Sequence, residues 1–452
     1  MDTFEPIRLH PEASKTFNEK AEALLPLLSE VPVLGPEVGG FKPQIHPRAN
    51  LTGEDIVGGV KVGLMDGRGM EYGKLFEHDG KTFGLVGRGF KDLQTLAGRI
   101  QETESVRPYI SVQRITECGF EWLRRRHGGN TSEPFIEFAL REASSQVGEN
   151  EIWHPLYHVF IQSDLVVGKV VFKTLTPKMF GRWDQIPEGV PQEQRAAIHA
   201  AIGARRSKLQ GCAAATIKLI AEPLRAEELS MQEAERSIAC LRFFHPANLS
   251  PYIRSFCTTT GKENLSMTSA LLVRDGQIVR SSEKLNTRSG TTWMIPDEEI
   301  REIRAVALDS LSRMLLGEKT SPFEQELLDA ILVYSRNSLF DDPLNRLIYI
   351  LSALESLLLR DKNEPIQKNL AERLAFIVGV TIEEREKVRD NATRVYGLRS
   401  EFLHHGKGTI QMEELESFML NVWKAFVALI HNVDRFPTRQ DLIVALERRK
   451  MA

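Results

Sequence analysis

The sequence Tyr-Gly-Leu-Arg-Ser-Glu-Phe-Leu-His-His-Gly, residues 396–406, lies in the last quarter of the chain among segments with helical periodicity. It places Arg399 ahead of His404 and His405. An arginine keeps its positive charge at any working pH and can hold a phosphate with two hydrogen bonds, whereas a histidine gains or loses a proton near neutrality. This combination suits cleavage of a phosphodiester bond without a metal ion.

Several start signals predict helices around this stretch. Ser-Pro-Phe-Glu at 321–324 has the pattern of a capping box with proline at the first helical position, and Asp-Pro at 342–343 starts a helix in the same way. Thr-Ile-Glu-Glu at 381–384 caps the helix that carries the arginine and the histidines. Apolar residues at three- and four-residue spacing over 412–430 predict a last core helix. The sequence therefore predicts an all-α bundle over residues 320–452.

Three of these helical segments resemble the Apea-like branch of the HEPN superfamily. Residues 346–359 match its first core helix, with Glu355 set among leucines, and residues 370–377 are similar to its second helix, with Arg373. The third segment is similar to the Arg-x4-6-His motif of that superfamily.

This resemblance, which covers residues 347–433, implies a four- or five-helix bundle and a ribonuclease site built across a dimer. It implies attack of an RNA 2′-hydroxyl on the adjacent phosphorus, assisted by a histidine as general base or acid and by an arginine that opposes the developing negative charge. Neither a metal nor a cofactor is implied. The implied catalytic residues are Arg399, His404, His405 and Glu355, and the implied substrate-binding residues are Ser400 and Arg373.

The spacing of the motif restricts how its residues meet. Positions five apart on an ideal helix differ by roughly 140° around the axis, so Arg399 and His404 do not easily converge from one intact helix. Either the helix loosens at His404, which Gly406 would encourage, or two copies of the domain bring their motifs together. The resemblance favours the second arrangement, with His405 as the alternative to His404.

A structural explanation of the same residues stays open. Arg399 can pair with Glu401 or Glu355 as a stabilising ion pair, and histidines at a helix end favour its negative pole. In that case the bundle would be a scaffold that dimerises, or that binds RNA or a nucleotide without cutting it.

Composition bounds the rest of the chain. Its 452 residues predict two or three domains, and 42% hydrophobic and 26% charged residues are typical of a soluble globular protein. The formal net charge of −3 gives no global attraction for nucleic acid, and basic and acidic residues are equal in number over 343–436. Contact with RNA would therefore depend on a local basic patch.

The cysteines and the amino terminus indicate the compartment. Cys118, Cys212, Cys240 and Cys257 form no Cys-x2-Cys pair, which predicts free thiols in a reducing environment and no zinc or redox site. We see no signal peptide, and no uncharged apolar run approaches the roughly 20 residues that cross a bilayer. We therefore expect a cytoplasmic protein that makes no membrane contact.

Residues 1–180 carry strand-like patterns. Asp-Gly at 66–67 and at 79–80 between apolar segments predicts tight hairpins. Residues 109–115 alternate like a half-buried strand, and residues 156–175 contain two further strand-like segments. We expect a β-rich region that recognises a trigger, a substrate or a partner.

Residues 181–319 are expected to be mixed α/β. The alanine-rich sequence over 191–244 predicts two long helices separated near Pro223, and apolar residues on either side of Asp-Gly at 275–276 predict another hairpin. Together with the helical carboxyl-terminal region, the predicted fold class is α+β multidomain.

The densest basic cluster of the front half is Arg-Arg-Arg-His at 124–127, beside Trp122. Such a cluster either holds single-stranded nucleic acid by charge and stacking or is a solvated turn, and base rates for short charge runs favour the turn.

The leading hypothesis is a metal-independent endoribonuclease of the antiviral-defence or toxin type, a homodimer through the carboxyl-terminal bundle, restrained by a trigger or antitoxin partner. The alternative is the non-catalytic RNA- or nucleotide-binding protein that uses the bundle as a scaffold.

Overall fold

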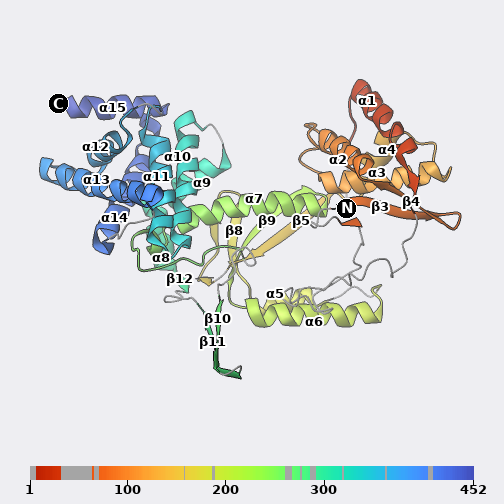
Figure 1. Ribbon diagram of the computed structural model, residues 1–452, viewed down its shortest axis with the longest axis horizontal. Coiled ribbons are helices and arrows are strands. Elements are labelled where there is room, and N and C mark those ends of the chain that lie inside the picture. Colours follow the sequence, from red (N-terminus) through yellow and green to blue (C-terminus); the bar gives the residue numbers. More distant parts are fainter. Residues whose placement is uncertain are drawn as a thin grey trace. The chain divides into compact units, whose positions relative to one another are not determined.

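The computed structural model describes residues 7–31, 64–65, 71–156, 158–185, 189–259, 267–274, 277–285, 292–317, 320–361, 364–405 and 411–451. The fold is mixed α/β, with several small sheets and a helical carboxyl-terminal region (Figure 1). The chain divides into two compact units. The first contains residues 1–152, 180–208 and 218–230, and the second contains residues 153–179, 209–217 and 231–452. This division differs from the predicted boundaries at 180 and 319.

The described residues of the first unit up to Ser144 form a small sheet and four α-helices, and residues of α6 (Gln192–Leu209) also belong to this unit. The sheet has the strand order β1-β4-β3-β2, all antiparallel. Its strands and helices are β1 (Ser29–Glu30), β2 (Leu64–Met65), β3 (Glu71–His78), β4 (Lys81–Val86), α1 (Pro11–Glu22), α2 (Arg88–Gln101), α3 (Val112–His127) and α4 (Phe135–Ser144). The predicted hairpin at Asp79-Gly80 is confirmed, because β3 and β4 pair around it and both residues have positive φ, +49° and +73°. The other predicted hairpin, at Asp66-Gly67, lies outside the described residues.

The core of the first unit is helical. Trp122 of α3 is fully buried, stacks edge-on against Phe135 of α4 at 5.4 Å between ring centroids, and donates its indole N–H to the carbonyl of Glu133 at 2.9 Å. Buried side chains of α2, such as Phe90 and Leu93, complete the same cluster. The expectation of a β-rich region over 1–180 is therefore wrong for residues 88–144, where three helices form most of the core.

The predicted strand over 109–115 is also wrong. A turn precedes α3, whose first residue is Val112, and the Ser111 hydroxyl caps that helix by accepting from the Arg114 backbone N–H at 3.1 Å. The buried carboxylate of Glu222 accepts from the Ser111 backbone N–H at 3.0 Å and from two N–H groups at the start of α7 (Pro223–Arg242). A contact 111 residues away in the sequence thus stabilises the turn and the helix start, which local alternation does not reveal.

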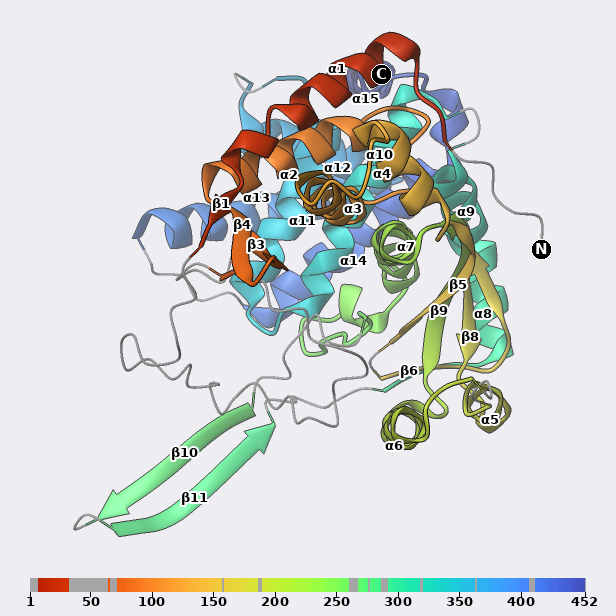
Figure 2. The ribbon, with the colours of Figure 1, turned by 90° about the vertical axis from the view of Figure 1, so that its right-hand side faces the viewer.

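A second four-stranded sheet has the order β5-β9-β8-β7 (Figure 2). Its strands are β5 (Gly148–Pro155), β7 (Leu165–Val167), β8 (Val170–Thr174) and β9 (Ala213–Ala221). β7 and β8 form a hairpin that turns at Gly168, which has φ +61°, so the strands expected over 156–175 are confirmed.

The middle of the chain contains one strand that we had predicted to be helical. α6 (Gln192–Leu209) and α7 (Pro223–Arg242) confirm the two long helices, but β9 lies between them. Residues 213–217 of β9 are all buried, and β9 pairs antiparallel with β8. Alanine side chains are small enough for a strand that is buried on both faces. An alanine-rich composition alone therefore does not distinguish such a strand from a helix.

Two further strand pairs include strands from residues 181–319. β10 (Met267–Arg274) and β11 (Gln277–Leu285) pair as the predicted antiparallel hairpin (Figure 2). β12 (Trp293–Ile295) pairs in parallel with β6 (Val159–Ile161).

Helices make up the rest of the second unit. They are α8 (Asp297–Ile303), α9 (Asp309–Leu316), α10 (Pro322–Tyr334), α11 (Pro343–Leu358), α12 (Ile366–Val378), α13 (Ile382–His405), α14 (Met412–His431) and α15 (Arg439–Met451), with a short π-helix, Arg304–Leu308, between α8 and α9. Ser321 and Glu324 form the predicted capping box, and Asp342 caps α11 with Pro343 at its first position. Helices α11 to α14 pack against one another (Figure 1).

The helical region shares its core with the middle of the chain. The Trp423 indole of α14 donates to the carbonyl of Phe243 at 3.2 Å, and the two rings stack at 5.9 Å between centroids. Arg346 of α11 is 0% exposed and donates to the carbonyls of Phe340, Ala247 and Ser250 at 2.7, 3.1 and 3.0 Å, and also to that of Ile253. Residues 231–259 thus belong to the same compact unit as the helices.

Candidate functional site

Helix α13 carries the arginine and histidines singled out in the sequence. The Thr381 hydroxyl accepts from the Glu384 N–H at 3.2 Å and the Glu384 carboxylate accepts from the Thr381 N–H at 3.2 Å, so the predicted cap is confirmed. The helix then runs without interruption to His405. The arrangement in which the helix loosens at His404 is therefore not the one adopted, and the two positions remain roughly 140° apart around the axis.

The side chains of the motif lie outside the described part of the chain. This applies to Arg399, Ser400, His404 and His405, of which the structure gives only the helical backbone positions, and to Gly406. The ion pair considered between Arg399 and Glu401 or Glu355 lies outside it for the same reason.

Glu355 of α11 lies next to the motif helix. Its side chain is half-buried, and its Oε1 accepts a hydrogen bond of 3.0 Å from the Tyr396 hydroxyl of α13. Tyr396 is three residues before Arg399, less than one helical turn away. The structure thus brings Glu355 to the helix that carries Arg399 and His404, although they are more than 40 residues apart in the sequence.

Arg373 of α12 makes its contacts inside the bundle. It is 4% exposed, and its guanidinium donates to Glu364 at 2.8 and 3.0 Å, to Glu447 of α15 at 3.0 and 3.2 Å, and to the Leu358 carbonyl. Burial alone would raise the pKa of Glu364, but the hydrogen bonds from Arg373 hold that pKa below its usual value. Contact of Arg373 with a substrate phosphate, as expected from the resemblance, would require its ion pairs with Glu364 and Glu447 to open. In the structure Arg373 instead connects α12 to α15.

Polar contacts also attach α13 to α14. Arg394 forms an ion pair with Glu414 at 2.8 Å, and the Asn391 amide donates to the Glu414 carbonyl at 2.9 Å. Nearer the start of the helix Arg389 pairs with the adjacent Asp390 at 2.9 Å. Arg389 and Arg394 are therefore engaged by acidic neighbours within the bundle.

The basic cluster at 124–127 forms the last turn of α3. Arg124 and Arg125 share the carboxylate of Glu121 at 2.6 and 2.7 Å, which lowers the pKa of Glu121. Arg126 pairs with Glu22 of α1 at 3.2 Å. Each arginine has an acidic partner, and this pairing supports the structural explanation over a nucleic-acid groove.

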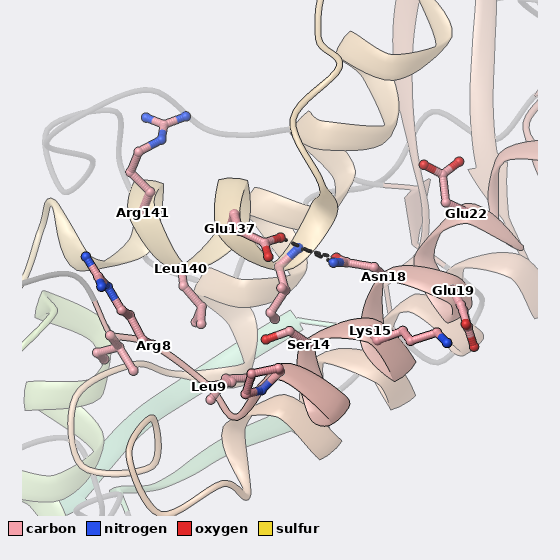
Figure 3. Close-up of a pocket in the computed structure, with 13 residues that line it drawn as sticks. Arg8, Leu9, Ser14, Lys15, Asn18, Glu19, Glu22, Glu137, Leu140 and Arg141 are labelled. Carbon is pink, nitrogen blue, oxygen red and sulfur yellow. Dashed lines mark hydrogen bonds between the residues drawn. The ribbon is translucent and has the colours of Figure 1, made fainter.

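A pocket of about 910 Å³ lies between α1 and α4 of the first unit (Figure 3). Asn18 bridges the two helices, because its amide donates to Glu137 at 3.2 Å and its carbonyl accepts from the Ile136 N–H at 2.7 Å. Arg8 and Lys15 line the pocket together with Glu19 and other acids, so charges of both signs surround it. No pattern in the sequence predicts this pocket, because its two walls are more than 100 residues apart in the chain.

The cysteines are free thiols, as expected. Cys118, Cys240 and Cys257 are buried and Cys212 is partly buried. Burial raises the pKa of Cys118 to about 11 and that of Cys240 and Cys257 to about 12. These three thiols are protonated near neutrality and are poor nucleophiles.

Among the described residues no helix has both the length and the apolarity to cross a membrane, and no three His, Cys, Asp or Glu side chains cluster as metal ligands would. Comparison with protein-family models, with curated proteins and with solved structures found no match to this chain.

Proposed function

We propose that the carboxyl-terminal helices form a metal-independent endoribonuclease of the HEPN type. The observation that carries the proposal is the hydrogen bond from Tyr396 to Glu355, because it joins the acidic residue of the first core helix to the helix that bears Arg399 and His404. The order and lengths of α11 to α14 support the same assignment.

The active unit in this proposal is a homodimer. Because α13 is continuous to His405, the positions of Arg399 and His404 on one copy are roughly 140° apart around the helix axis. A second copy then supplies the complementary residue across the interface. Arg399 holds the phosphate, His404 transfers the proton with His405 as its alternative, and Ser400 donates to a phosphate oxygen.

The test is cleavage of labelled single-stranded RNA by the full-length protein in EDTA. We expect products that end in 2′,3′-cyclic phosphate. Arg399→Ala and His404→Ala should each lower the rate by about 100-fold or more. Arg389→Ala, an exposed arginine of the same helix, and His431→Ala, an exposed histidine of α14, are matched controls that should leave the rate unchanged.

Three results would contradict the proposal. Cleavage abolished by EDTA would contradict the metal-free mechanism, and full activity in the Arg399→Ala and His404→Ala proteins would contradict the site. Sedimentation of a fully active protein as a monomer would contradict the dimer. Unchanged RNA binding without any cleavage would instead favour the scaffold alternative.

The remaining parts of the proposal follow from this activity. RNA is the substrate, the cytoplasm is the expected compartment, and a trigger or antitoxin acts through the amino-terminal region. The four free cysteines suit a reducing compartment.

A further inference from the structure

A second pocket lies inside the second unit, and no described residue of α13 is among those that line it. It has a volume of about 640 Å³, which falls within the range of small-molecule sites in proteins. Its walls come from the carboxyl-terminal half of α7, the segment at 258–259, the end of α10 with the following 3-10 turn (Ser335–Leu339), and α11. These elements are brought together only by the tertiary fold.

The pocket is basic. Arg236, Arg242 and Arg336 line it, and Glu235 is the one acidic residue among the described lining residues. Arg236 is half-buried and Arg336 is exposed, and neither makes a hydrogen bond or an ion pair with another described residue. Two guanidinium groups that have no acidic partner among the described residues and line one cavity are suited to binding an anion, since arginine binds phosphate with paired hydrogen bonds.

Two of the polar lining residues, Arg242 and Thr259, are buried. Arg242 is 6% exposed and donates to the carbonyls of Ser335 and Cys257 at 3.0 and 2.8 Å, which holds its positive charge beside the cavity. Thr259 is 2% exposed, and its hydroxyl has no hydrogen-bond partner among the residues that the structure describes. Buried hydroxyls are normally paired, so this one indicates a group that is supplied from the cavity.

Another part of the lining is aromatic and apolar. Phe340 and Tyr349 line the pocket and stack with 5.1 Å between ring centroids and 16° between planes. Ile238, Ala239 and Leu339 extend the apolar surface. A planar ring system is a suitable neighbour for this wall, because aromatic rings stack on tyrosine and phenylalanine.

We propose that this pocket binds a nucleotide. The phosphate is held by Arg236 and Arg336 beside the positive charge of Arg242, the Thr259 hydroxyl pairs with an oxygen of the ligand, and the base lies against Tyr349. This site is proposed independently of the ribonuclease, since the described residues that line it include none from the motif helix.

The test is calorimetric titration of the full-length protein with AMP, GMP, CMP and UMP, and with adenosine and inorganic phosphate as partial ligands. We expect at least one monophosphate to bind with one site per chain, and adenosine and phosphate each to bind at least tenfold more weakly. Arg236→Gln and Arg336→Gln should each lower the affinity for that nucleotide by about tenfold or more. Arg435→Gln, an exposed arginine elsewhere in the same unit, is the matched control and should bind as the wild type does.

Two further variants separate the parts of the site. Tyr349→Leu should weaken nucleotide binding and leave phosphate binding unchanged, and Thr259→Val, which keeps the shape of the side chain, should weaken binding several-fold with no loss of thermal stability. The proposal is overturned if none of the four monophosphates binds, if phosphate alone binds as tightly as the nucleotide, or if the two arginine variants bind as the wild type does. Cleavage is not measured, so the outcome does not depend on nuclease activity.

Discussion

The arginines of the first unit and those of the second unit differ in how their charge is used. Arg124, Arg125 and Arg126 are consecutive and therefore prominent in the sequence, yet each is paired with Glu121 or Glu22. Arg236 and Arg336 are 100 positions apart, have no such partner among the described residues, and border the same pocket. The availability of an arginine for a ligand thus depends on its neighbours in the fold more than on the local density of positive charge.

The largest effect of pairing on stability is expected at Arg373, because this arginine is both paired with acids and buried. Arg373→Ala would leave Glu364 and Glu447 without their cation, and we expect it to lower the free energy of unfolding by about 3 kcal/mol. Urea denaturation followed by circular dichroism measures this. Arg389→Ala, which removes an exposed pair on α13, should leave the free energy of unfolding nearly unchanged. An equal loss of stability in the two variants would contradict the expected difference between the buried and the exposed ion pairs.

The same ion pair predicts a pH dependence. The pKa of Glu364 is lowered in the folded protein, so its pair with Arg373 contributes stability above the unfolded value near 4.5, and this contribution is lost as the pH falls through the lower folded value. Between pH 5 and pH 3 the wild type should therefore lose more stability than Arg373→Ala does. Denaturation midpoints at a series of pH values check this, and parallel curves for the two proteins would contradict it.

The smallest effect is expected at the basic cluster of α3. Arg124→Gln and Arg125→Gln each remove one partner of an exposed pair with Glu121 and should change the free energy of unfolding by less than about 1 kcal/mol. Because Glu121 already neutralises part of this turn, the affinity for single-stranded RNA should stay unchanged in a filter-binding assay. A tenfold loss of RNA affinity would show that the cluster is a nucleic-acid contact after all.

Local signals predicted the parts of the fold that depend on neighbouring residues. The capping box of Ser321 and Glu324, the cap at Asp342 and the turn at Asp79-Gly80 each involve residues within a few positions of one another, and each is confirmed. The strand predicted over 109–115 is wrong because Glu222 stabilises the backbone at Ser111, and β9 was missed because it pairs with β8 about 40 residues earlier.

The candidate sites also differ in whether their residues are close together in the chain or are brought together only by the fold. The sequence singled out the motif on α13, because its residues are close together in the chain, and it named Glu355 by resemblance. It did not reveal the partners of Arg373, since Glu447 is 74 residues away. The pocket bordered by Arg236 and Arg336 was also missed, because its residues come from elements that only the tertiary fold brings together.

The four carbonyl groups around Arg346 have a practical consequence for any attempt to isolate the helical region. A fragment that began at residue 320 would keep the acceptor at Phe340 and lose those at Ala247, Ser250 and Ile253. The Arg346 guanidinium, which is fully buried in the intact chain, would then lack three of its four hydrogen-bond acceptors. The shortest stable fragment therefore has to begin before residue 247.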